Sequence, residues 1–161
     1  MGNVPGTGVN LLEKRRIEAE ILAEVYAVLT ERLGRVAALD AVEDTILRAA
    51  YEAGKAFAAS APQGPSLEHF VTLTEIWRCG GALTIENVRH APDSVSFDVT
   101  RCRYAECYRE MGLPEELATR LSCLRDGAFC SGYSPCLTLT RPETIASGAK
   151  CCPFTFTWIE A

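Results

Sequence analysis

The spacing of apolar residues changes near Ala82, and this change limits the chain to folds that combine helices with a sheet. Before this point, apolar residues recur at three- and four-residue steps, as they do in amphipathic helices. After it, Leu83 and Ile85, and later residues 95–99, alternate between apolar and polar, as in half-buried strands. The sequence therefore predicts an α+β protein.

Two amphipathic helices are predicted before position 60. Their apolar residues recur between Leu12 and Leu33 and between Leu39 and Phe57, and prolines 62 and 65 prevent the second helix from continuing. Ser66 can cap a third, shorter helix that Gly80-Gly81 ends. The apolar face of the first helix consists of Ile17, Ile21, Val25 and Val28. We expect these faces to be packing surfaces.

The second half of the chain is predicted to form a β-β-α-α-β-β unit with a small, mainly antiparallel sheet. Turn residues at 91–94 join the first two strands, helices are expected over 100–111 and from Pro114, and the last strands over 136–140 and 152–159. We expect a single domain over residues 1–161, with a helical portion at 1–81 and an α+β catalytic portion at 82–161.

Composition restricts the partners of this chain. Its 161 residues carry a formal charge of −5 without a dense Lys/Arg run, so neither nucleic acid nor an anionic membrane is expected to bind. A small-molecule ligand is expected instead, and the oligomeric state stays open, with a homodimer among the alternatives. The first residues contain no apolar signal segment, and no apolar run is long enough to span a bilayer, which predicts a cytoplasmic protein.

Eight cysteines are the most unusual feature of the composition. In a cytoplasmic protein they are expected to be reduced thiols. Because no C-x-x-C pair occurs and both histidines lie upstream of most of the cysteines, we predict no metal site and no other cofactor. A single free cysteine usually behaves as a small buried apolar residue, so chemistry has to be argued from a combination of groups.

One combination lies on the helix predicted from Pro114. Leu117, Leu121 and Leu124 form a stripe that should face the core. If the helix reaches Asp126, then Cys123 and Asp126 share another face, and Gly127 frees the backbone to turn. A thiol and a carboxylate are thus expected to meet near a helix end.

The last predicted strand adds a second thiol. Alternation along this strand puts Cys152 on the same face as Phe154, Phe156 and Trp158. A thiol beside aromatic rings has a raised pKa unless a cation or a proton acceptor assists it, and Asp126 could be that acceptor.

The segment from Phe97 to Phe156 resembles the L-2-amino-thiazoline-4-carboxylic acid hydrolase family. The resemblance runs through FDVTRCRYAECYREMGLPEELATRLSCLRDGAF and GYSPCLTLTRPETIASGAKCCPFTF. Its ordered elements are Thr-Arg-Cys at 100–102, Cys-x-x-Asp at 123–126, Leu-Thr-Arg at 139–141, and Gly148 followed by Cys152. More distantly, the segment is similar to the organomercurial (alkylmercury) lyases, whose catalytic groups are two cysteines and one aspartate. These resemblances imply an alkylmercury-lyase-like fold and catalytic roles for Cys123, Asp126 and Cys152.

The implied reaction is the hydrolytic opening of a small cyclic amidine, such as a 2-amino-thiazoline carboxylate. A thiolate of Cys152 or Cys123 would add to the ring carbon while Asp126 relays protons. Arg125 or Arg101 would hold the substrate carboxylate, and the substrate site would also include Cys102 and Phe154. Two alternatives stay open. One is carbon–mercury bond cleavage by the same three groups, and the other is a non-catalytic, thiol-rich module that binds soft metals or senses oxidation.

Overall fold

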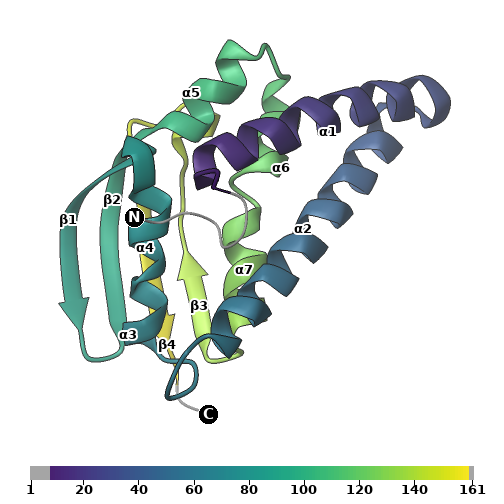
Figure 1. Cartoon of the computed structure of the whole chain (residues 1–161). Helices are drawn as coiled ribbons and strands as arrows, with labels where there is room; N and C mark the ends of the chain where they lie inside the picture. The colour runs from purple at the N-terminus through teal and green to yellow at the C-terminus, as the bar shows by residue number, and fades with distance from the viewer. Residues whose placement is uncertain (1–7, 160–161) are drawn as a thin grey trace.

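A four-stranded antiparallel sheet forms one side of the molecule (Figure 1). In the computed structural model, which describes residues 8–159, the strands are β1 (Leu83–Ala91), β2 (Ser94–Cys102), β3 (Leu137–Thr140) and β4 (Cys152–Trp158). Their order in the sheet is β1-β2-β4-β3, so β4, the last strand in sequence, lies between β2 and β3. The predicted α+β class and the small antiparallel sheet are confirmed. The likeness to alkylmercury lyases stays a prediction.

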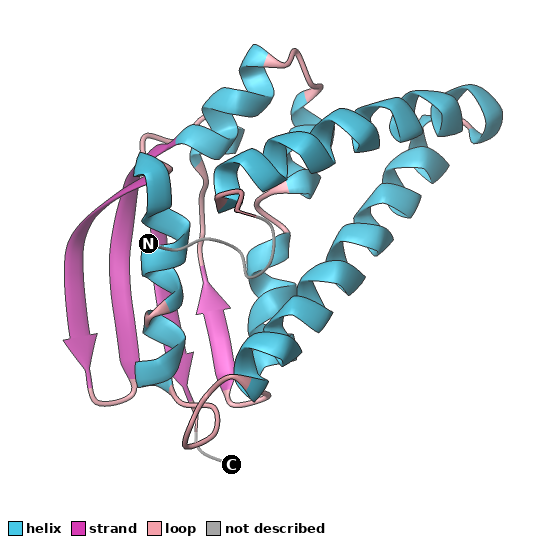
Figure 2. Ribbon diagram, in the orientation of Figure 1, coloured by secondary structure: helices cyan, strands magenta, loops and turns pink. Residues whose placement is uncertain are grey.

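Helices cover one face of this sheet, and a long helical hairpin extends away from it (Figure 2). The hairpin consists of α1 (Leu11–Leu33) and α2 (Arg35–Ala59). The shorter helices are α3 (Leu67–Val71), α4 (Leu73–Arg78), α5 (Arg103–Glu110), α6 (Glu115–Leu121) and α7 (Arg125–Tyr133), with 3₁₀ turns η1 (Cys79–Gly81) and η2 (Ile145–Ser147). The third predicted helix is thus two helices, and Ser66 caps the first of them by accepting a 3.1 Å bond from the His69 N–H.

The core lies between the sheet and the helices on its covered face. Side chains of β2 and β4 alternate between buried and partly exposed, as the period of two predicts. Phe154 and Phe156 of β4 pack with Phe97 of β2, and Phe70 of α3 covers Phe156 with ring centres 4.9 Å apart. Cys152 belongs to this same buried face, as expected from the alternation.

Helix α1 differs from the expectation drawn from its apolar stripe. Ile17, Ile21, Val25 and Val28 are 41–65% exposed, so this face is not a packing surface within the chain. The opposite face packs instead, with Ala19 fully buried and Leu22, Ala23 and Tyr26 against the same cluster. Small alanines let a helix approach its neighbours closely, whereas periodicity cannot decide between two apolar faces.

The helix predicted from Pro114 is also two helices. Helix α6 ends at Leu121, residues 122–124 form a turn in which the Ser122 backbone is distorted (φ −118°, ψ −67°), and α7 begins at Arg125. Cys123 therefore lies in the connecting turn rather than on one helix face with Asp126. Leu124, predicted to face the core, is exposed, whereas Leu117 and Leu121 are buried.

Helix α7 continues past Gly127 to Tyr133, and two other glycines let it approach α2 closely. A Cβ atom on Gly54 of α2 would lie 2.2 Å from the Phe129 carbonyl oxygen, and one on Gly132 of α7 would lie 2.0 Å from the Tyr51 carbonyl oxygen. The backbones of α2 and α7 thus touch directly, which only glycine permits at these positions. This contact fixes α7, and with it Asp126, relative to the helical hairpin.

No helix between residues 8 and 159 is both long and apolar enough to cross a membrane. Residues 1–7 and 160–161 of the expected 1–161 domain lie outside the described residues, and the single-domain expectation stays a prediction.

Candidate active site

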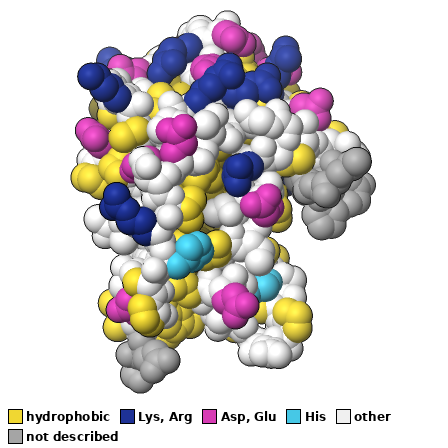
Figure 3. Space-filling model, turned by 90° about the vertical axis from the view of Figure 1, so that its left-hand side faces the viewer, with side chains coloured by type: hydrophobic (Ala, Val, Ile, Leu, Met, Phe, Trp, Pro, Cys, Tyr) yellow, Lys and Arg dark blue, Asp and Glu magenta, His cyan; other side chains and the backbone are white. Residues whose placement is uncertain are grey.

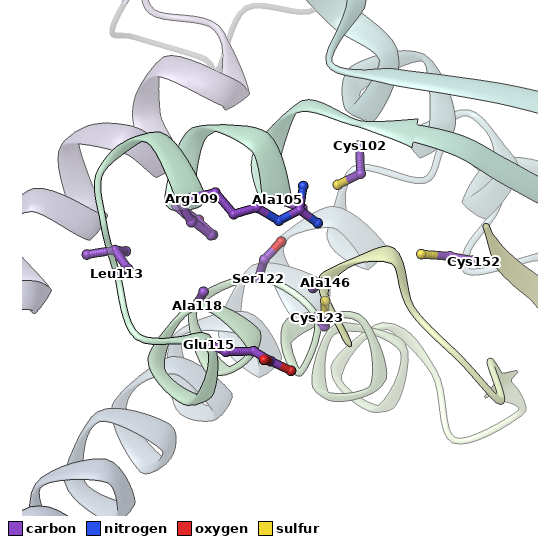
Figure 4. Close-up of a pocket in the computed structure, with 11 residues that line it drawn as sticks. Cys102, Ala105, Arg109, Leu113, Glu115, Ala118, Ser122, Cys123, Ala146 and Cys152 are labelled. Carbon is purple, nitrogen blue, oxygen red and sulfur yellow. The ribbon is translucent and has the colours of Figure 1, made fainter. Parts of the chain in front are cut away.

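One pocket lies where the end of β2, the α6–α7 turn and the start of β4 come together (Figure 4). Its volume is about 230 Å³, below the range of about 300–1,000 Å³ that is usual for drug-sized ligands. The residues lining it are Cys102, Ala105, Tyr108, Arg109, Leu113, Glu115, Ala118, Ser122, Cys123, Ala146 and Cys152. The pocket is therefore smaller than a typical site for a drug-sized ligand, and the expected small-molecule partner stays a prediction.

Three cysteine side chains line this pocket, and each comes from a different element. Cys102 ends β2 and precedes α5, Cys123 lies in the turn between α6 and α7, and Cys152 begins β4. In Figure 4 the three sulfur atoms point toward the same space. The pocket brings together both predicted catalytic thiols and adds Cys102, which was expected to bind substrate. Their roles stay predictions.

Asp126 does not line the pocket but is linked to it through Arg141. Nη1 of Arg141 donates to the Asp126 carboxylate, and Nη2 donates to the Cys123 carbonyl oxygen over 2.7 Å. The Arg141 guanidinium also lies over the Phe154 ring, 5.1 Å from its centre. Sequence reasoning did not single out Arg141, although it ends the Leu-Thr-Arg motif at 139–141. Arg141 thus holds Asp126 and the backbone of Cys123 in one arrangement.

Burial dominates the electrostatics of the thiols. It raises the pKa of Cys123 to about 12, with Asp126 acting in the same direction and the Arg141 charge opposing it. Burial also raises the pKa of Cys102 and of Cys152. The pKa of Asp126 is itself raised by burial, which outweighs the nearby Arg141 charge. The site therefore favours neutral thiols unless a local group stabilises a thiolate.

Cys152 has such a group. The backbone N–H of Ile145 donates to Sγ of Cys152 over 3.1 Å, and this bond and the Arg141 charge both lower the Cys152 pKa against the effect of burial. Ile145 is presented by the η2 turn, in which Thr144 caps the backbone by accepting from the Ser147 N–H over 3.2 Å. Gly148 closes this turn with φ +94°, a left-handed conformation that favours glycine.

Comparison with known proteins extends the resemblance beyond the C-terminal half. The sequence model of the family described as L-2-amino-thiazoline-4-carboxylic acid hydrolase matches residues 14–156, from α1 to β4. The chain belongs to this family. The resemblance noted over residues 97–156 is confirmed, and the family match extends further toward the N-terminus, into the α1–α2 helical hairpin. No curated protein matches the sequence of this hydrolase-family chain.

Solved structures share the fold of this L-2-amino-thiazoline-4-carboxylic acid hydrolase family member. One is the crystal structure of the phenol-responsive sensory domain of the transcription activator PoxR with phenol. The two superpose with a TM-score of 0.53 at 12% sequence identity, over 89% of this chain and 74% of the other. At this identity the likeness concerns the fold alone.

Three of the residues predicted to bind substrate lie outside the pocket lining of this family member. Arg101 is exposed and pairs with Glu106, whereas Arg125 is largely but not fully buried and pairs with Glu18 of α1 at 3.0 Å. Burial lowers the Arg125 pKa to about 10. Phe154 belongs to the aromatic core. None of the three lines the described pocket, and their substrate contacts stay untested predictions.

Other groups that line the pocket escaped sequence reasoning. Arg109 of α5 and Glu115 of α6 are exposed charged residues, and Ser122 lies in the α6–α7 turn. No sequence signal marks them, because each is an ordinary polar residue on a short helix or turn. Within residues 8–159, no group of three or more His, Cys, Asp or Glu side chains is arranged to hold a metal ion.

Proposed function

We propose that this chain hydrolyses a small cyclic amidine, of the kind represented by 2-amino-thiazoline-4-carboxylate, with a cysteine nucleophile. The observation that supports this most directly is the convergence of Cys102, Cys123 and Cys152 on one small pocket. Thiolates add readily to electrophilic carbon, and the amidine carbon between two heteroatoms is such a centre. Family membership favours the same class of reaction.

Cys152 is the nucleophile in this proposal. Of the two thiols predicted to be catalytic, Cys152 receives the Ile145 N–H bond, whereas burial and Asp126 hold Cys123 protonated with a pKa of about 12. After its proton is lost to water, the Cys152 thiolate adds to the amidine carbon and a ring carbon–heteroatom bond breaks. Cys123 donates its proton to the departing sulfur or nitrogen atom.

Water completes the reaction. It attacks the carbon of the covalent adduct, one of its protons returns to Cys123, and the Cys152 thiolate leaves. The net change is the addition of one water molecule to the ring compound. Asp126 acts on Cys123 by raising its pKa, and Arg141 positions both groups.

The test is incubation with 2-amino-thiazolines, hydantoins and related cyclic amidines, followed by mass spectrometry for the addition of one water. The variants Cys152→Ser, Cys123→Ser and Asp126→Asn should each lose activity by roughly a thousandfold while staying folded by circular dichroism. Cys107→Ser is the matched control, because Cys107 contacts Met111 and does not line the pocket. Full activity in any two of the three variants would sink the proposal.

Carbon–mercury bond cleavage is the second candidate, since a pair of soft sulfur atoms lining one pocket suits a mercury compound. Here two thiolates would hold the metal while a proton goes to the carbon. Release of methane from methylmercury by this chain, under excess thiol, would favour this candidate. If a cyclic amidine binds to the chain but is neither hydrolysed nor altered, a non-catalytic module is the better description.

A further inference from the structure

Two opposite charges flank the pocket, and neither has an ion-pair partner among the described residues. Arg109 lies in the last turn of α5, and its Nη2 donates to the Ile145 carbonyl oxygen over 3.1 Å. A guanidinium has five N–H donors, so most of the Arg109 donors are free for a ligand. Glu115 begins α6, and no side chain in the described part of the chain donates to its carboxylate.

The other arginines near the site are already committed to carboxylates. Arg101 pairs with Glu106, Arg125 with Glu18 and Arg141 with Asp126. An arginine that must bind a substrate carboxylate bidentately would first have to give up such a partner, at a cost in free energy. Arg109 has no such partner to give up.

The placement of the two groups fits a ligand with a charge at each end. In Figure 4, Arg109 extends over the pocket from α5 and Glu115 reaches it from α6, with Ser122 and Cys123 between them in this view. Although the net charge is −5, Lys and Arg side chains gather at the end of the molecule that carries α5 (Figure 3). This end therefore attracts an anionic group.

We infer that Arg109 and Glu115 select a zwitterionic substrate, with Arg109 binding its carboxylate and Glu115 binding its protonated amidine. This inference rests on the proposed function. Amidines are strong bases and carry a positive charge at neutral pH, so an amino-thiazoline carboxylate has one charge for each side chain. Binding of the substrate at both charged ends orients its ring, so that the amidine carbon faces the thiols.

Arg109, the group proposed to bind the substrate carboxylate, is also connected to the nucleophile Cys152 through one residue, Ile145. The Ile145 carbonyl oxygen accepts from Arg109, and the Ile145 N–H donates to Cys152. Arg109 thus braces the η2 turn that supports the Cys152 thiolate. A substrate carboxylate would share the guanidinium with Ile145 while the brace stays in place, because the remaining donors suffice.

The experiment compares 2-amino-thiazoline-4-carboxylate with the same ring lacking the carboxylate, using steady-state kinetics of the full chain. Arg109→Gln should raise KM for the carboxylate compound about ten- to a hundredfold and leave KM for the other ring nearly unchanged. Loss of the brace on η2 should lower kcat for both rings alike, so the difference between the rings in KM is the readout of carboxylate binding. Glu115→Gln should raise KM for both rings. Arg103→Gln is the matched control, since Arg103 is also exposed on α5 and bonds to a carbonyl, that of Gly80, outside the pocket.

The outcomes separate this inference from the proposed function. If the wild-type chain hydrolyses the carboxylate compound but Arg109→Gln matches Arg103→Gln, the inference is wrong and the function stands. If the wild-type chain hydrolyses neither ring, calorimetric binding of both rings replaces turnover. Loss of carboxylate-ring binding in Arg109→Gln alone would then support the inference, and equal binding in both variants, or no binding to the wild-type chain, would overturn it.

Discussion

The backbone N–H of Ile145 points at the sulfur of Cys152, with 3.1 Å between the two atoms. This bond joins the η2 turn to the first residue of β4, and it is the direct polar contact of the Cys152 thiol in the described part of the chain. A donor aimed at sulfur stabilises the thiolate more than the thiol, so it lowers the pKa that burial raises.

Replacing Ile145 with proline removes this donor at modest structural cost. Ile145 is the first residue of η2, where proline is well tolerated, and the preceding Thr144 has the extended conformation that proline favours (φ −138°, ψ 149°). We expect Ile145→Pro to slow alkylation of Cys152 by iodoacetamide at pH 8 about tenfold, because hydrogen bonds to charged groups are worth about 1.5–3 kcal/mol. Peptide mass spectrometry would measure the rate of alkylation at Cys152. Ile145→Ala keeps the N–H, and an equal effect in that variant would assign the change to lost packing.

Arg141 should govern the pH dependence of the thiols. Its charge lowers the pKa of both Cys123 and Cys152, so its removal raises them further. In Arg141→Gln the pH profile for alkylation of Cys152 should therefore move to higher pH, and kcat/KM for the ring substrate should fall. Arg141→Lys keeps the positive charge but lacks the forked donors of the guanidinium, so its pH profile and its kcat/KM should lie between those of the wild-type chain and Arg141→Gln.

The control for this prediction is Arg120→Gln. Arg120 is another partly buried arginine with a carboxylate partner, Glu43, but it lies away from the pocket. An alkylation profile that moves equally in Arg120→Gln and Arg141→Gln would show that lost stability, rather than the local charge, is responsible.

Sequence patterns predicted the parts of this structure that depend on local periodicity. The β1–β2 hairpin and the buried face that carries Cys152 follow from alternation along the strands, and the Ser66 cap follows from side-chain chemistry. The exposed stripe of α1 could not be foreseen, because Ala19 and Ala23 form a second apolar face that packs instead. The break after Leu121 was missed because the apolar spacing continues to Leu124 and the helix was expected to turn only at Gly127.

The site was predictable only in part. The Cys-x-x-Asp spacing and the strand face identified Cys123 and Cys152, which do line one pocket. The partner of Asp126 is Arg141, which is 15 residues away in sequence. Arg109 of α5 lines the same pocket and donates to Ile145 of η2, which is 36 residues away in sequence. Such contacts depend on tertiary structure, so spacing alone does not reveal them.

Alkaline pH should destabilise the fold through its buried thiols. Burial raises the pKa of Cys123 and of Cys130 to about 12, so both stay neutral in the folded chain after they ionise in the unfolded chain. Above the ordinary thiol pKa the unfolded state binds fewer protons, and stability falls as pH rises, by at most about 1.4 kcal/mol per thiol and pH unit. Urea unfolding under reducing conditions between pH 8 and 10.5 would measure this. Cys130→Ala should be less stable than the wild-type chain at pH 7, but its free energy of unfolding should decrease less between pH 7 and pH 10.5. The same dependence of unfolding free energy on pH in both chains would contradict the prediction.

The close contact between α2 and α7 gives a stability prediction with an internal control. Gly54→Ala and Gly132→Ala would each place a methyl group about 2 Å from a backbone carbonyl oxygen of the opposite helix. Because backbone atoms cannot move aside as a flexible side chain can, the helices must separate, and each variant should lose about 2–4 kcal/mol of unfolding free energy.

Gly127→Ala is the matched control, since Gly127 also lies in α7 but a Cβ atom there would meet nothing within 4 Å. Alanine is favoured over glycine inside a helix, so this variant should gain about 0.5–1 kcal/mol. Urea unfolding of the three variants gives the comparison. If Gly132→Ala proved as stable as Gly127→Ala, the direct backbone contact between α2 and α7 would be wrong. The placement of Asp126 beside Arg141 would then lose its support, because α7 carries Asp126 into the site.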